Sequence, residues 1–281
     1  MTLDDIRFIF NRAFRHTLHR KKIFWTFLVM ALCGVMVVFF RGLAVSAGDW
    51  VTLSLTFMPV FLCGGVLLSA GILLIRMYHD EVKQREVKFR EVLYKSWDLI
   101  IAASYFSVPI ILCYMLLWML LGIFILLSRI PAVGPFFSVI LSFGPFLLNL
   151  GTLILIFLNL SLLFFLAPIL ALKGGNRKQV PQTLLKRFES DPFLNMYLFV
   201  ISIVPLTINL GLLIGATLLT GSLCYECDTA LHTVLLWFSL MVPFTAFLSP
   251  AVVFFFNFAA EAHVLLQKKV QQDKQNAAGA V

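Results

Sequence analysis

The sequence predicts an all-α integral membrane protein with six transmembrane helices. Hydrophobic residues make up 60% of its 281 residues and charged residues only 13%, whereas about 25% of a soluble domain is charged. Apolar runs of at least about 18 residues also recur along the chain, which is the length of helix that about 30 Å of hydrocarbon requires. A chain of this composition is expected to fold in lipid.

Six spans and one short tail follow from these runs. We place the spans near residues 23–40, 51–75, 99–127, 146–172, 194–220 and 234–260. Together they form a single membrane domain over residues 1–260, and residues 261–281 form a short tail whose distal part is expected to be disordered. The first apolar run and the basic segment before it are both too long for a signal peptide, so we expect a retained helix.

The basic residues predict the orientation. Of the 22 Lys and Arg residues, 20 fall in segments on one side of the predicted membrane, and only Arg41 and Arg129 fall on the other. Cytoplasmic loops accumulate such residues, so we predict a multi-pass protein of the bacterial cell inner membrane with cytoplasmic N- and C-termini. The net charge of +8 then belongs to one face, where the expected partners are anionic membrane lipids and not nucleic acid.

Three basic segments on the cytoplasmic side are expected to form amphipathic interfacial helices. In the first, Ile6, Phe10, Phe14 and Leu18 recur at every fourth residue, which places them on one helix face. The second covers residues 82–98. The third covers residues 180–190 and should end before Asp191-Pro192, because the residue before a proline disfavours helix.

These segments also suggest an internal repeat. Each one precedes a pair of spans, so the chain can be described as three helix-hairpin pseudo-repeats. One region departs from this scheme, because residues 136–172 contain no charge and would form about 55 Å of helix, too long for one crossing. We predict a break at Gly144-Pro145, with residues 131–144 forming an interfacial or re-entrant piece.

Two stretches carry a resemblance to known proteins. They are "GGVLLSAGILLIRMYHDEVKQREVKFREVLYKSWDLIIAASYF" and "FLAPILALKGGNRKQVPQTLLKRFESDPFLNMYLFVI". Their pattern resembles uncharacterised bacterial six-helix membrane proteins that are similar to the membrane domain fused to some glycerophosphodiester phosphodiesterases. The resemblance implies the fold and the membrane location. It carries over no functional residue and no enzymatic activity.

The spans contain no charged residue near their middle, which disfavours proton pumping, intramembrane proteolysis and metal chemistry within the bilayer. We find no catalytic constellation and expect neither a cofactor nor a metal. One polar stripe does occur, since Asn149, Thr152 and Asn159 fall within about 80° of one another on a helix. It could form a substrate pathway, but hydrogen bonding between helices is the favoured interpretation.

Small residues form two further patterns within the spans. Gly211 and Gly215 make a GxxxG motif in the fifth span. The second span has a face of Gly64, Gly65, Ser69 and Gly71. We interpret both as seams where helices pack together.

The basic segments supply the candidate binding residues. A set of eight bases is expected to contact anionic lipid or a protein partner, namely Arg85, Lys88, Arg90, Lys95, Arg177, Lys178, Lys186 and Arg187. Each base close to an anionic membrane surface contributes about 1 kcal/mol of binding. A generic positive-inside charge distribution would explain the same residues without specific binding.

A C-x-x-C motif, Cys224 and Cys227, lies in "GSLCYECDTALH" on the predicted outer side. A structural disulfide is favoured because that side is oxidising, and free thiols, a redox site or a metal site are alternatives. Neighbouring Glu226 and Asp228 would destabilise a thiolate, and one C-x-x-C lacks the second ligand pair of a zinc site.

The function predicted from these features is a non-enzymatic membrane module that interacts with anionic lipid, a membrane partner or a second copy of itself. A permease for an uncharged or lipidic substrate is the alternative, and it would use the polar stripe of the fourth span. A thiol-disulfide oxidoreductase is a third candidate, which depends only on the C-x-x-C motif.

Overall fold

The computed structural model describes residues 3–45, 47, 49–85, 89–128, 130, 134–173, 180, 182–185, 191–220 and 230–278. These residues form helices and turns, with no strand among them. The long helices are α1 (Leu3–Arg15), α2 (Arg20–Ala44), α3 (Asp49–Val82), α4 (Phe89–Ser128), α5 (Gly134–Lys173), α7 (Pro192–Leu219) and α8 (Ala230–Ala278).

Six helices in the described part of the chain are long and apolar enough to cross a membrane. They cover Arg20–Ala44, Ser54–Val82, Tyr105–Leu127, Phe146–Leu172, Pro192–Leu219 and Leu231–Lys269. Each overlaps one predicted span, so the all-α, six-span fold is confirmed. The last helix extends well beyond the predicted end at residue 260, which brings Glu261 and its neighbours into an ordered helix.

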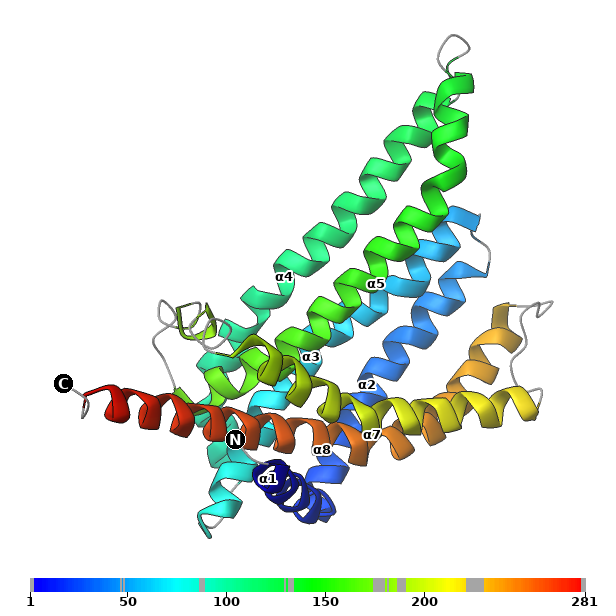
Figure 1. The fold of residues 1–281 in the computed structure, drawn as a ribbon. Coiled ribbons are helices and arrows are strands. Elements are labelled where there is room, and N and C mark those ends of the chain that lie inside the picture. The colour runs from blue at the N-terminus through cyan, green and yellow to red at the C-terminus, as the bar shows by residue number, and fades with distance from the viewer. Residues whose placement is uncertain are drawn as a thin grey trace.

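The helices of each predicted hairpin lie in contact, α2 with α3, α4 with α5 and α7 with α8. The α4–α5 hairpin packs beside α3 and extends past the far ends of α2 and α3 (Figure 1). Helix α8 contacts α1, α2, α3, α5 and α7. It is therefore the element around which the two ends of the chain are assembled.

The middle of α8 forms the centre of the hydrophobic core. Residues 251–263 are all buried, and all of them except Asn257, Glu261 and His263 are apolar. Aromatic rings surround it: the Phe164 ring of α5 lies 5.5 Å from Phe199 of α7 and 5.9 Å from Phe255 of α8, measured between centroids. These contacts join three helices that are distant in sequence.

The predicted apolar stripe of the first segment is divided in the structure. Ile9 and Ala13 are buried, and the Phe10 ring lies 5.0 Å from that of Phe254 on α8. Phe14 and Leu18, which the stripe also contains, are exposed at the protein surface. Helix α1 therefore packs one side on α8 and leaves other apolar side chains exposed at the protein surface.

The second predicted segment does not form a separate helix over residues 82–98. Helix α3 ends at Val82, and from Phe89 onward the segment is the first part of α4. Of the third segment, the structure describes Val180 and residues 182–185, which are helical. The predicted boundary after it is confirmed, since α7 begins at Pro192.

The predicted break at Gly144-Pro145 is wrong, because α5 is one helix of 40 residues from Gly134 to Lys173. Helix α4 is equally long, and the two helices lie in contact. Interior prolines also occur in α3, α4, α7 and α8, and packed membrane helices tolerate them when neighbours compensate the lost hydrogen bond. A proline therefore does not end the helix here.

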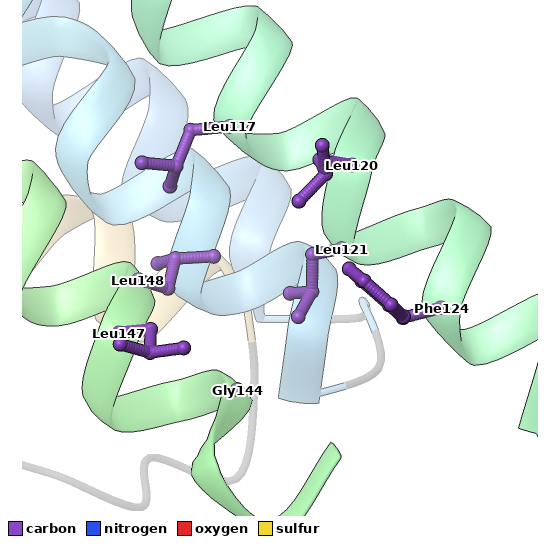
Figure 2. Close-up of a pocket in the computed structure, with 7 residues that line it drawn as sticks. All are labelled: Leu117, Leu120, Leu121, Phe124, Gly144, Leu147 and Leu148. Atoms are coloured by element: carbon purple, nitrogen blue, oxygen red, sulfur yellow. The ribbon is translucent and has the colours of Figure 1, made fainter. Parts of the chain in front are cut away.

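An apolar groove of about 160 Å³ lies along this part of the α4–α5 hairpin (Figure 2). Its lining consists of Leu117, Leu120, Leu121 and Phe124 from α4 and Gly144, Leu147 and Leu148 from α5. The lining side chains carry no polar group, so only apolar material fits this groove.

The two glycine patterns behave differently. A methyl group added at Gly64 would overlap the Asn159 side chain, and one added at Gly71 would overlap Phe256. These α3 glycines therefore form the predicted packing seam. Gly211 and Gly215 of α7 have nothing within 4 Å of an added Cβ, so the GxxxG motif is not a seam within the described chain.

Candidate functional site

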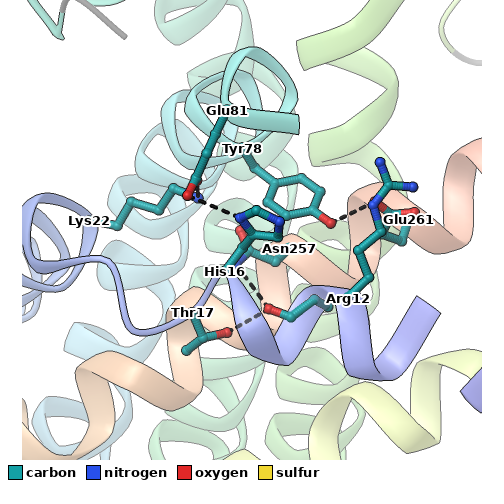
Figure 3. A network of polar contacts seen from close by, with 9 residues as sticks. Arg12, His16, Thr17, Lys22, Tyr78, Glu81, Asn257 and Glu261 are labelled. Carbon is teal, nitrogen blue, oxygen red and sulfur yellow. Dashed lines mark hydrogen bonds and ion pairs between the residues drawn. The ribbon is translucent and has the colours of Figure 1, made fainter. Parts of the chain in front are cut away.

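Polar side chains from four helices meet at one end of the bundle (Figure 3). We call it the basic end. It comprises α1, the α1–α2 connection, the first turn of α2, the end of α3 with the turn after it (residues 74–85) and residues 257–269 of α8. Sequence reasoning predicts that this end faces the cytoplasm.

Lys22 and Glu81 form the centre of this cluster. The Lys22 side chain is only 2% exposed and makes an ion pair with Glu81 at the end of α3. Its Nζ atom also lies 5.0 Å from the centroid of the Tyr78 ring, close enough for a cation–π contact. His16 Nδ1 lies 3.0 Å from the other Glu81 carboxylate oxygen. A buried ammonium requires such partners, because leaving it unpaired away from water is costly.

A second carboxylate completes the cluster. The Tyr78 hydroxyl donates a hydrogen bond to Glu261 of α8 at 2.6 Å. The same carboxylate oxygen lies 3.4 Å from Nε of Arg12 on α1. Glu261 therefore joins α1 and α3 to the core helix, and the polar contacts run without interruption from α2 to α8.

Asn257 lies one turn before Glu261 and on the same side of α8. It is fully buried, and its amide nitrogen donates to the Ala13 carbonyl at 3.5 Å. The Thr17 hydroxyl donates to the same carbonyl at 2.8 Å. Both bonds engage the last turn of α1, where carbonyl groups lack partners within the helix, so Asn257 helps to hold α1 on α8.

Sequence reasoning missed this cluster, although signals for it exist. Asn257 and Glu261 are four residues apart, and Tyr78 and Glu81 are three apart, so each pair lies on one helix face. Lys22 stands directly at the start of an apolar run. The sequence does not show that these two helix faces lie against each other, or that Lys22, at the start of α2, lies beside Tyr78 and Glu81.

A cavity of about 360 Å³ adjoins the cluster. It is lined by His19, Lys21 and Lys22 from the α1–α2 connection and the start of α2, and by Met77, Glu81, Gln84 and Arg85 from the end of α3. His19, Lys21, Gln84 and Arg85 are exposed at the protein surface, so the cavity is open to the outside.

Of the eight bases predicted to contact lipid or a partner, the structure brings Arg85 to this cavity. Arg90 and Lys95 lie on the first turns of α4, and their side chains are outside the described part of the structure. Lys88, Arg177, Lys178, Lys186 and Arg187 lie outside the described residues. Lys21 and Lys22, which were not predicted from the sequence as binding residues, also line the cavity.

The polar stripe of the fourth span does not line a common cavity. Asn149 is exposed at the protein surface, whereas Thr152 and Asn159 are buried. Asn159 lies against Gly64 of α3. Neither the basic cavity nor the apolar groove is lined by any of the three, so the stripe fits helix packing better than a pathway.

The cysteines offer no assembled reactive site among the described residues. Cys224 and Cys227 lie outside those residues. Cys33 and Cys63 are buried, with the Cys63 thiol 3.6 Å from the Cys33 carbonyl oxygen, and Cys113 is exposed. No group of three or more His, Cys, Asp or Glu side chains that could hold a metal ion occurs in the described part of the chain.

Comparison with known proteins gives no relative. No protein family model matches the chain, and no significant match is found among curated proteins or among solved structures. The resemblance to the membrane domain of some phosphodiesterases therefore stays a prediction.

Proposed function

We propose that this chain is a non-enzymatic multi-pass protein of the bacterial inner membrane, with both termini in the cytoplasm, that binds anionic lipid at its cytoplasmic face. The six membrane-length helices support a membrane protein. The division of Lys and Arg residues, 20 against 2, supports the orientation. In this orientation the basic end lies at the cytoplasmic surface of the bilayer.

The observation that carries the proposal is the outer side of α1. Phe8 and Phe14 are 64% and 57% exposed there, and Arg7 and Arg15 are also exposed. Large apolar side chains beside basic ones are typical of a helix in the membrane interface, where the apolar groups enter the head-group boundary and the bases contact anionic head groups.

The buried side of α1 fixes the position of its exposed side. Ile9 and Ala13 are buried against the core, and Asn257 holds the Ala13 carbonyl. The protein therefore presents the outer side of α1 to lipid in a fixed position. A helix held in this way loses less conformational freedom on binding than a free amphipathic segment, which favours binding.

Native mass spectrometry of the gently extracted protein tests the proposal. We expect anionic lipids to be retained in preference to zwitterionic ones. Each base near the surface contributes about 1 kcal/mol, so Arg7→Glu/Arg15→Glu should reduce this retention by at least about tenfold. The matched variant Arg7→Lys/Arg15→Lys keeps the charge and should retain the lipid.

Equal retention of both lipid classes in the wild type, or no difference between the two variants, would reject lipid binding through α1. Release of a bound protein subunit in place of lipid would favour the protein-partner or homo-oligomer alternative. Orientation has its own test: a protease added to spheroplasts should leave a C-terminal tag intact and remove it only after lysis.

A further inference from the structure

The basic cavity at the ends of α2 and α3 has the properties of a ligand site. Its volume of about 360 Å³ lies in the lower part of the range for small-molecule sites, about 300–1,000 Å³. It is separate from the outer side of α1, since His19, Lys21 and Lys22 from the chain after α1 form one wall and the last turn of α3 forms the other.

The charges of the cavity select the class of ligand. Among the described residues that line the cavity, Lys21, Lys22 and Arg85 are cationic and Glu81 is the one acid, which leaves a formal charge of +2. The Glu81 carboxylate is already engaged by Lys22 and His16, and no described acidic residue forms an ion pair with Lys21 or Arg85. A phosphate monoester carries about −1.5 to −2 at neutral pH, whereas a phosphate diester carries a single negative charge.

Gln84 gives an independent reason to regard the cavity as a site. Its φ angle is 54°, in the left-handed region that glycine adopts at the end of a helix. The Arg85 amide donates to the Asp80 carbonyl at 3.0 Å and the Gln84 amide to the Glu81 carbonyl at 3.0 Å, which is the Schellman arrangement.

A residue with a side chain is strained at this position, and glycine would relieve the strain. The side chain of Gln84 lines the cavity, where its amide can donate hydrogen bonds. The same turn places Arg85 immediately after it, at the rim. Strain at a residue that lines a cavity is expected where the side chain is used for binding.

We propose that this cavity binds a phosphate monoester group, with the head group of an anionic lipid of the phosphatidate type as its source. Lys21 and Arg85 would make charge-assisted hydrogen bonds to the phosphate oxygens, Gln84 would donate a neutral one, and Lys22 would contribute charge from the wall while it stays paired with Glu81. The choice of a lipid as the source of the phosphate rests on the proposed function. The choice of a phosphate monoester rests only on the charges of the cavity.

The experiment uses the full chain in phosphatidylcholine nanodiscs. Binding of phosphatidate is compared with binding of phosphatidylglycerol at matched surface charge, and inorganic phosphate and glycerol 3-phosphate are titrated separately. We expect phosphatidate to be preferred. A soluble monoester that binds as tightly as phosphatidate supports the site but assigns it to a soluble ligand. Equal binding of phosphatidate and phosphatidylglycerol would overturn the proposal.

Two double variants remove the same charge from neighbouring positions. Lys21→Gln/Arg85→Gln takes it from the cavity and should weaken phosphatidate binding by at least about tenfold, because two charge-assisted bonds are lost. Arg20→Gln/Lys83→Gln removes the same charge from exposed residues that are not among the residues lining the cavity. It should weaken binding clearly less than the cavity variant does, because only general attraction to the anionic surface is lost. Equal losses would mean general surface attraction, which rejects the site but leaves the binding through α1 intact.

Gln84→Gly separates strain from function. It keeps every charge and relieves the left-handed strain, so the protein should be at least as stable to heat as the wild type. Phosphatidate binding should nevertheless weaken several-fold. Unchanged binding would show that Gln84 takes no part and would remove the second line of support.

Discussion

Lys22, at the start of α2, is almost completely buried and is paired with Glu81, at the end of α3. Removing one member of a buried ion pair leaves an uncompensated charge, which costs about 3–5 kcal/mol. We therefore predict that Glu81→Gln lowers the free energy of unfolding by about this amount. Chemical or thermal unfolding of the purified protein in one detergent measures it.

The control for this pair is Lys22→Met/Glu81→Gln, which removes both charges and keeps the apolar stem of residue 22. It should recover most of the lost stability, because replacing a whole buried pair is often nearly neutral. If Glu81→Gln alone changes stability by less than about 1 kcal/mol, the pair is not the buried link described above.

Two partners of Glu261 should differ in importance. Tyr78 donates to it at 2.6 Å from a buried position, and a hydrogen bond to a charged group contributes about 1.5–3 kcal/mol. Arg12 is 37% exposed and lies 3.4 Å away, and exposed pairs contribute about 0–1 kcal/mol. Tyr78→Phe should therefore destabilise the protein more than Arg12→Gln in thermal unfolding; the reverse order would contradict the geometry.

The α3 glycine seam can be tested against the open glycines of α7. Gly64→Ala forces a methyl group onto Asn159 and should cost about 1–3 kcal/mol. Gly211→Ala meets open space and should be neutral or stabilising, since alanine is about 1 kcal/mol better than glycine within a helix. Thermal unfolding of the two variants measures both effects.

A double-mutant cycle sharpens this comparison. In an Asn159→Ala background the overlapping side chain is gone, so Gly64→Ala should cost less than it does in the wild type. If Gly64→Ala costs the same in both backgrounds, its overlap with Asn159 is not the source of the destabilisation.

Docking of α1 on α8 gives a fourth prediction. Ala13 is fully buried, so Ala13→Leu has no room and should loosen α1, which hydrogen exchange of residues 3–18 would detect as faster exchange. Overpacking of this kind typically costs about 1–3 kcal/mol. Phe8→Ala is the matched change on the exposed side of the same helix and should leave the exchange of α1 unchanged; similar acceleration in both variants would argue against the assigned faces.

Several local features were accessible from the sequence for clear physical reasons. The boundary at Asp191-Pro192 follows from the steric effect of proline on the preceding residue, and α7 begins there. The α3 glycines were recognised as a seam because only small residues allow close approach of two helices. The same reasoning failed for Gly211 and Gly215, because a small residue permits a contact but does not supply the partner.

Composition alone dictates that this chain forms six membrane-length helices, because the thickness of the hydrocarbon layer sets the length of each helix and the apolar side chains require lipid around them. The packing of the helices decides what covers each helix face: Ala13 is buried whereas Phe14 of the same helix is exposed, Asn159 is buried while Asn149 is not, and α5 continues through Gly144-Pro145 beside an equally long α4. It also decided that Lys22 meets Glu81. The reason is that periodicity assigns residues to a common face, whereas the neighbour that covers this face depends on how distant segments pack.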